Sequence, residues 1–180
     1  MSPRDTVRRT LKRTTPQWVR KLAWRTAGHV LHRLFPPPPD TPEVAALKAQ
    51  LRTMPWFHSI DLGNGVFTPG QEPTGYKLRR LGMPEDLTGK MVLDIGAYDG
   101  FFSFEAERRG AARVLATDCV CWGGQDSYGV RGNDNRPCFD LAHKALKSRV
   151  ESKTIDLFDL SPQSVGRFDL VLFLGVLYHM

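Results

Sequence analysis

The stretch Met91–Gly100, MVLDIGAYDG, constrains the fold of this 180-residue chain more than any other. Its first half is a short apolar run, which is typical of a strand covered on both faces in a parallel sheet. Its second half contains Gly96 and Gly100, where the backbone can turn tightly and come close to a ligand. Residues 101–109, FFSFEAERR, predict a helix whose first N–H groups face this loop.

Two ligand classes use such a strand, glycine loop and helix, and the glycine spacing distinguishes them. A dinucleotide site has the pattern G-x-G-x-x-G, in which the second glycine lets a pyrophosphate approach the helix. Here Tyr98 stands at that position, and Asp94 stands two residues before Gly96. A carboxylate there suits a cationic amino-acid group better than a diphosphate, and Asp99 adds a second acceptor beside the loop. A dinucleotide-dependent oxidoreductase therefore ranks low, and a glycine turn without a ligand is the other alternative.

The segments that follow add acidic residues at strand ends. Residues 113–118, RVLATD, predict a second strand ending in Asp118, which stands 22 residues after the first glycine of the loop. An acidic side chain there can accept both hydroxyls of a ribose. Residues 152–156, SKTID, predict a third strand closed by Asp156, a candidate partner for an adenine amino group. Residues 168–175, FDLVLFLG, predict a fourth, strongly apolar strand.

Taken in order, the pattern D-x-G-x-x-x-G, the acid after the second strand and the closing run FDLVLFLGVLYHM resemble the motifs of the class I S-adenosylmethionine (SAM) dependent methyltransferases. The resemblance implies a Rossmann-like α/β sheet with the strand order 3-2-1-4, and SAM as the cofactor. It assigns cofactor binding to Asp94, Gly96, Ala97, Tyr98, Gly100, Asp118, Asp156, Leu174 and Gly175.

The segment before the first strand narrows this resemblance. Residues 56–69, WFHSIDLGNGVFTP, predict a β-hairpin. This hairpin, a helix bearing Lys77 and the sequence GVLYH at 175–179 resemble the tRNA wobble-uridine (mo5U34) methyltransferases and carboxymethyltransferases. The resemblance implies that Lys77 and Tyr178 help to bind a carboxylated cofactor, so carboxy-SAM is a second candidate. Relatives also modify small molecules and glycans, and the acceptor stays open between these and RNA.

Methyl transfer from a sulfonium is an in-line displacement with a good leaving group, so alignment in a dry site can supply most of the rate. A dedicated base is therefore not obligatory. Tyr178 and His179 are the candidates to orient an oxygen nucleophile or take its proton. His179 could equally cap and pack the end of the fourth strand.

The cysteines and the apolar runs of the sequence indicate where such a chain is found and what it binds. The three cysteines, Cys119, Cys121 and Cys138, form no disulfide-like framework, which favours a reduced, cytoplasmic location. Their spacing is not that of a usual zinc site, even with His143, so we predict no metal. No run reaches the roughly 18 apolar residues that would span a bilayer.

The N-terminal part differs in charge from the rest. Residues 1–35 carry nine Lys or Arg against one acidic residue, whereas the other 145 residues sum to −2. From residue 16 a basic amphipathic helix is predicted, which could bind RNA, an anionic membrane surface or a partner, or dock on its own domain. Four prolines end this helix. The expected units are a basic leader at 1–40, a helix plus hairpin extension at 41–85 and a partial methyltransferase domain at 86–180.

The predicted sheet has four strands, whereas the fold of the family that this chain resembles has a sheet of seven strands. Its fourth strand would be a long apolar edge of the kind that soluble proteins avoid. We therefore expect a fragment or a truncated reading frame that is poorly soluble by itself. The alternative to an enzyme is a non-catalytic remnant whose basic N-terminal helix binds RNA, a membrane surface or a partner protein.

Overall fold

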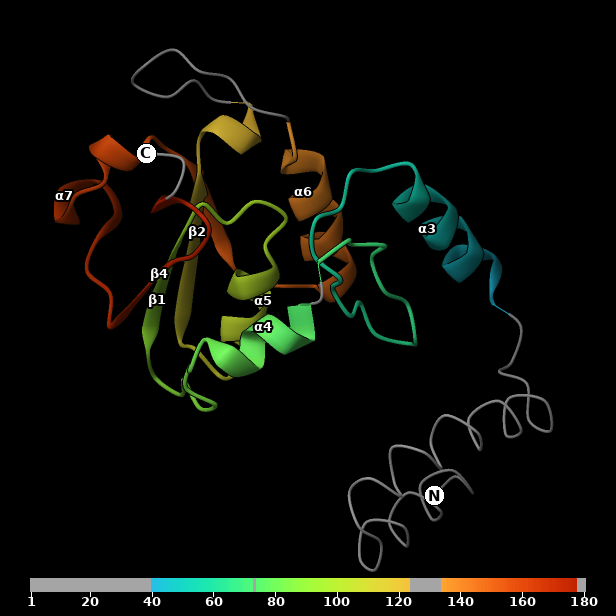
Figure 1. Cartoon of the computed structure of the whole chain (residues 1–180), viewed down its shortest axis with the longest axis horizontal. Coiled ribbons are helices and arrows are strands. Elements are labelled where there is room, and N and C mark those ends of the chain that lie inside the picture. Colours follow the sequence, from blue (N-terminus) through green and yellow to red (C-terminus); the bar gives the residue numbers. More distant parts are fainter. Residues whose placement is uncertain (1–39, 73, 124–133, 178–180) are drawn as a thin grey trace, which may run out of the picture. The chain divides into compact units, whose positions relative to one another are not determined.

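The computed structural model describes residues 40–72, 74–123 and 134–177 (Figure 1). The predicted leader helix, most of the loop after the second strand, Tyr178 and His179 lie outside the described residues. Contacts divide the chain into the units Met1–Pro42 and Glu43–Met180, and the description below concerns the second unit.

A four-stranded parallel sheet forms the centre of this unit. The strands are β1 (Met91–Ile95), β2 (Arg113–Asp118), β3 (Glu151–Thr154) and β4 (Leu170–Phe173), in the spatial order β3-β2-β1-β4. The α/β class and the predicted strand order are therefore confirmed. Strand β1 lies inside the sheet, with Val92 opposite Val114 of β2 on one side and opposite Leu170 of β4 on the other.

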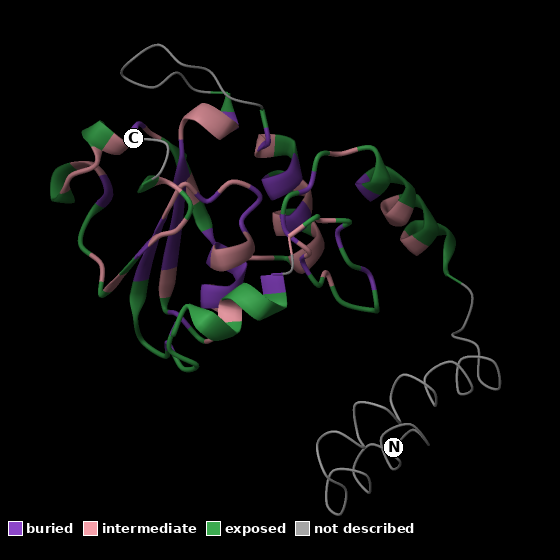
Figure 2. Cartoon of the chain, in the orientation of Figure 1, coloured by how far each residue is buried: buried purple, intermediate pink, exposed green. Residues whose placement is uncertain are grey.

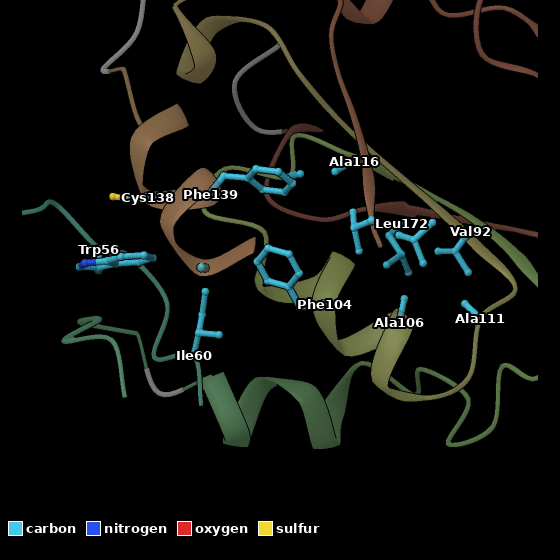
Figure 3. Packing of buried hydrophobic residues seen from close by; sticks show 14 of the residues in the cluster. Trp56, Ile60, Val92, Phe104, Ala106, Ala111, Ala116, Cys138, Phe139 and Leu172 are labelled. Carbon is cyan, nitrogen blue, oxygen red and sulfur yellow. The ribbon is translucent and has the colours of Figure 1, made fainter. Parts of the chain in front are cut away.

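Alternate residues of the strands face two separate apolar layers. On one face, Val92 and Leu172 pack with Phe104 and Ala106 of α5 (Phe101–Arg108) and with Phe139 of α6 (Arg136–Leu146) (Figure 3). On the other face, Leu93 and Leu115 pack with Val165 of the short helix α7 (Pro162–Val165). The period of two along β1 and β2 thus buries both faces of the sheet (Figure 2).

Helix α6 begins at Arg136 and ends at Leu146. Pro137 suits the first turn of a helix, where its missing N–H has no helical partner to lose. Lys147 then adopts a left-handed conformation with φ 52° and ends the helix.

The extension before β1 contains α3 (Pro42–Arg52) and α4 (Thr74–Arg80). The prediction of a β-hairpin at 56–69 was too regular, because this segment forms one antiparallel bridge, Asp61 with Phe67, and no strand. The Thr68 side chain contributes to this difference, since its Oγ1 accepts from Ile60 N at 2.7 Å and donates to His58 O at 2.6 Å, while Thr68 N still donates to Ile60 O at 3.0 Å. For Ile60 N, a side chain thus takes the place of a backbone ladder partner.

Among the described helices, none has both the length and the apolar character that crossing a membrane requires.

Candidate cofactor site

The loop between β1 and α5 has the sharp turns that its glycines predict. Gly96 and Gly100 have φ values of 75° and 87°. A Cβ at Gly100 would lie 2.6 Å from ring atoms of Phe104 and Phe139, so no larger residue fits there without displacing buried rings. Tyr98, which stands where a dinucleotide site has glycine, also has a positive φ of 55°. This is a left-handed conformation that residues with a Cβ seldom adopt.

Hydrogen bonds from the β2 side hold this loop. Gly96 N and Ala97 N both donate to Thr117 O, at 2.8 and 3.0 Å. Tyr98 N donates to Asp118 Oδ2 at 3.0 Å, and Tyr98 O accepts from the Trp122 indole at 2.7 Å. Both backbone polar groups of Tyr98 are therefore fixed by residues at or just after the end of β2.

Asp94 lies under the loop near the end of β1. Its side chain is only 2% exposed, and it accepts a hydrogen bond from Ser103 Oγ of α5 at 2.6 Å. Burial raises the pKa of Asp94 to about 6, although the Ser103 hydrogen bond acts in the opposite direction. Since burial disfavours the charged form, a cation bound beside this carboxylate would restore its ionisation.

Asp118 lies at the end of β2, as predicted. Its Oδ1 accepts from Cys121 N at 3.0 Å, and its Oδ2 accepts from Tyr98 N. Burial raises the pKa of this carboxyl group, and the backbone hydrogen bonds oppose the shift. A carboxylate has about four acceptor positions, so Asp118 keeps capacity for further donors such as ribose hydroxyls.

Asp156 was expected to close the third strand, but β3 ends two residues before it. It instead caps the short 3₁₀ helix η2 (Leu157–Asp159), accepting from Phe158 N at 2.8 Å. The preceding residue, Ile155, donates its N–H to Asp118 O at 3.0 Å. Asp156 is thus buried close to the end of β2, although in a cap and not in a strand.

The expectation that Asp99 is an acceptor beside the loop opening was wrong. Asp99 is fully buried and points to the extension, where its Oδ1 lies 2.6 Å from His58 Nδ1. Its Oδ2 accepts from Phe57 N at 3.1 Å and from His58 N at 2.8 Å. The sequence patterns missed His58, because no local spacing links residues 41 positions apart.

The other predicted residues lie at the margin of the loop or outside the described residues. Leu174 packs against the main core, and the segment after it covers the loop, since a Cβ at Gly96 would lie 2.3 Å from Val176 Cγ2. Lys77 forms an ion pair with Glu72 at 2.9 Å and lies 5.9 Å from the centre of the Phe57 ring. That ring meets Tyr98 edge-on, with centroids 5.8 Å apart, so one aromatic ring separates Lys77 from the loop.

Two of the three cysteine thiols are held in their protonated form by burial. Burial raises the pKa of Cys121 to about 11 and that of Cys138 to about 12, so both thiols are protonated at neutral pH. Within the described ranges, no three His, Cys, Asp or Glu side chains gather in a way that could hold a metal ion.

A small cavity of about 140 Å³ lies elsewhere, at the amino ends of β2 and β3, between Val114, Arg149 and Val150. Sites for small-molecule ligands have volumes of roughly 300–1,000 Å³, so this cavity is too small for a nucleoside cofactor. The loop at the carboxyl ends of β1 and β2 is the place where open α/β sheets bind such ligands.

Comparison with known proteins supports this interpretation. No protein-family model matches the chain. A tRNA U34 carboxymethyltransferase from Ectopseudomonas mendocina (strain ymp) is 29% identical over 140 residues, which cover 74% of this chain and 39% of that protein. The observed strand order, β3-β2-β1-β4, is the order that the resemblance to methyltransferases implied. The chain has the fold of a SAM-dependent methyltransferase. It spans about two fifths of the length of this curated relative.

Two solved structures share the fold of this chain. The crystal structure of EvdMO1 matches with a TM-score of 0.52 and 19% identity, covering 76% of this chain and 30% of that chain. The N-terminal domain of EvdMO1, crystallised in the presence of SAH (S-adenosylhomocysteine) and D-fucose, matches with a TM-score of 0.52 and 20% identity, covering 76% of this chain and 55% of that domain. The fold that the family resemblance implied is thus confirmed.

Proposed function

We propose that this protein binds SAM at the loop between β1 and α5 and transfers its methyl group to a nucleophilic acceptor. The observation that carries the proposal is the buried Asp94 carboxylate beneath that loop. Its charged form is disfavoured by burial, so the ammonium group of a methionine moiety is the kind of partner that it lacks.

The neighbouring residues fit the rest of the cofactor. Asp118 has acceptor capacity for the two ribose hydroxyls, and the buried Asp156 follows the residue bonded to Asp118, where an adenine amino group would reach it. The amino end of α5 begins directly after Gly100, and its partial positive charge favours the carboxylate of the methionine moiety. SAM supplies a methyl group on a positively charged sulfur, which is a good leaving group.

The contribution of the chain to catalysis is then mainly alignment. Hydrogen bonds from two neighbouring elements fix the loop, so the methyl group and an acceptor can be held in line without a loss of entropy during the reaction. Tyr178 and His179 are proposed to orient the acceptor or to remove its proton.

For the acceptor we propose a tRNA wobble uridine, which the name of the curated relative suggests. A sugar or another small molecule is the second candidate, because the EvdMO1 domain was crystallised with D-fucose. Incubation with methyl-labelled SAM tests the proposal, with tRNA lacking its wobble modification and a panel of deoxysugars offered separately. Label in tRNA supports the first acceptor, and label in a sugar supports the second. SAM binding without transfer to either class would favour the non-catalytic alternative.

Carboxy-SAM would use Lys77 in addition. The Lys77 ammonium forms an ion pair with Glu72, and its remaining N–H donors are the groups that a cofactor carboxylate would use. We expect Lys77→Ala to weaken carboxy-SAM binding and to leave SAM binding unchanged in calorimetric titrations. Arg79→Ala is the matched control on the same helix and should change neither affinity. Equal losses for both cofactors in Lys77→Ala would exclude a carboxylate-specific role.

A further inference from the structure

We propose that Asp99 and His58 are a positioning pair: they clamp the extension onto the cofactor loop, so that the SAM site is complete only with residues 56–60 in place. The inference rests on the proposed cofactor site. It concerns how the loop is held, and it can be tested without a ligand.

The first observation is the burial and full use of the Asp99 carboxylate. Asp99 has no exposed surface, and three groups of two adjacent residues meet it: His58 Nδ1 at 2.6 Å, His58 N at 2.8 Å and Phe57 N at 3.1 Å. A buried carboxylate is costly unless such hydrogen bonds satisfy it, and bonds to a charged acceptor are the strong ones. Removal of the partner therefore leaves Asp99 in an unfavourable state.

The second observation is that other residues of the extension hold the backbone of Phe57 and His58. The carbonyl of His58 accepts from Thr68 Oγ1 at 2.6 Å, and the carbonyl of Phe57 accepts from Glu72 N at 3.0 Å. Gly70 lies so close that a Cβ there would be 2.1 Å from the His58 carbonyl carbon. The segment up to residue 72 therefore wraps around Phe57 and His58 and presents their N–H groups to Asp99.

The third observation is the strained residue beside the pair. Tyr98 has a φ of 55°, a conformation that persists only where the surroundings over-determine it. Asp118 and Trp122 hold Tyr98 from the β2 side, and the Asp99 side chain ties the next residue to the extension. The loop is thus held on one side by residues at or after the end of β2 and on the other side by the extension.

The pair also touches the amino end of α5 and the rim of the site. The His58 ring stacks on Phe101, the first residue of α5, with centroids 5.4 Å apart and an interplanar angle of 22°. Phe57, held through its N–H, meets Tyr98 edge-on while 42% of its surface stays exposed. A loosened pair would therefore release the loop, the start of α5 and the Phe57 ring together.

Hydrogen exchange and SAH titration on matched variants test the pair. His58→Ala removes the side-chain hydrogen bond to Asp99 and the ring stacking on Phe101 and leaves the two backbone N–H bonds, whereas His58→Asn keeps a side-chain donor near the position of Nδ1. Ser148→Ala is the control: Ser148 Oγ donates to Glu107 Oε2 at 2.5 Å, which ties the other end of α5 to a residue 41 positions away. A hydrogen bond to a charged group corresponds to roughly 10- to 100-fold in an equilibrium constant.

We expect His58→Ala to speed the exchange of the amides at 96–104 by about tenfold or more relative to the sheet, and to weaken SAH binding by a similar factor. His58→Asn should restore both, and Ser148→Ala should leave both unchanged. If His58→Ala does not fold, Asp99→Asn replaces it, because its amide has nearly the same size as the carboxyl group and removes the negative charge of the acceptor.

A merely structural role predicts a different pattern. Exchange that rises uniformly over the sheet, loop exchange that stays at the wild-type rate, or an Asn variant no better than the Ala variant would overturn the proposal. If the wild type does not bind SAH, the proposed cofactor site fails, and loop exchange in the free protein still decides whether the pair positions the loop.

Discussion

At the scale of single residues, the buried carboxylate of Asp94 lowers the free energy of unfolding at neutral pH by a measurable amount. Its pKa rises from 3.8 to about 6, mainly because burial disfavours the charged form. The folded state therefore binds a proton more tightly than the unfolded state does. The stability linked to this proton is fully present below about pH 4 and is lost as the pH rises through about 6.

The variant Asp94→Asn should therefore be more stable than the wild type at pH 7.5. A shift of about 2 pKa units corresponds to about 3 kcal/mol in the free energy of unfolding, and the difference should shrink toward zero near pH 4. Urea unfolding at pH 4, 5, 6 and 7.5 measures it. Asp159→Asn, at an exposed carboxylate, is the control and should show no such trend. An Asp94→Asn protein less stable than the wild type at pH 7.5 would contradict the cost assigned to burial.

The same variant should lose cofactor binding although it folds better. An amide carries no charge to pair with an ammonium group, so the gain in stability and the loss of SAH affinity should appear together. This combination is typical of residues kept for function at the expense of stability.

The sequence could place some residues of the candidate site and not others. Asp94 and Asp118 lie at or near the carboxyl ends of two strands with clear apolar patterns. The carboxyl ends of neighbouring parallel strands meet at one edge of the sheet, so the proximity of these two residues was predictable. The pair of Asp99 and His58 was not, because it depends on how the extension folds back. Asp156 was placed near the correct position, although a cap replaces the end of the strand there.

At the scale of elements, the loop between β1 and α5 depends on glycine for two different reasons. Gly100 has a positive φ and also lies against two buried rings, whereas Gly89 has a φ of 75° with open space around it. A comparison of the two positions separates conformational strain from packing.

We expect Gly89→Ala to cost only the left-handed strain, about 1–2 kcal/mol in the free energy of unfolding. Gly100→Ala should cost about 1–3 kcal/mol more, because its Cβ would overlap Phe104 and Phe139. Urea unfolding of both variants under one condition gives the difference. Equal costs would show that the rings give way freely and that the loop tolerates a side chain.

The elements themselves followed from the sequence where the periodicity was strong. Strand β2 has the predicted boundaries, and β1 occupies the apolar run predicted before Gly96. The hairpin at 56–69 did not form as predicted, in part because the Thr68 hydroxyl competes with a backbone partner, and no periodicity reveals such competition.

At the scale of the whole molecule, charge separates the leader from the rest of the chain. Residues 1–35 carry a net charge of +8, and the remainder is slightly acidic. If the acceptor is tRNA, deletion of residues 1–35 should weaken binding and flatten its dependence on salt, because Lys and Arg contacts to phosphates release counterions. Filter binding at several salt concentrations measures both quantities. Unchanged affinity and slope would exclude the leader as an RNA-binding arm.

The central claim is that the loop between β1 and α5, with Asp94 and Asp118, binds a SAM-type cofactor. Calorimetric titration with SAH tests it most directly, on the wild type and on Asp118→Ala. We predict one binding site in the wild type and an affinity lowered at least about tenfold in Asp118→Ala, because two hydrogen bonds to ribose hydroxyls are lost. A folded wild type that binds no SAH, or an Asp118→Ala variant that binds it as tightly as the wild type, would contradict the claim.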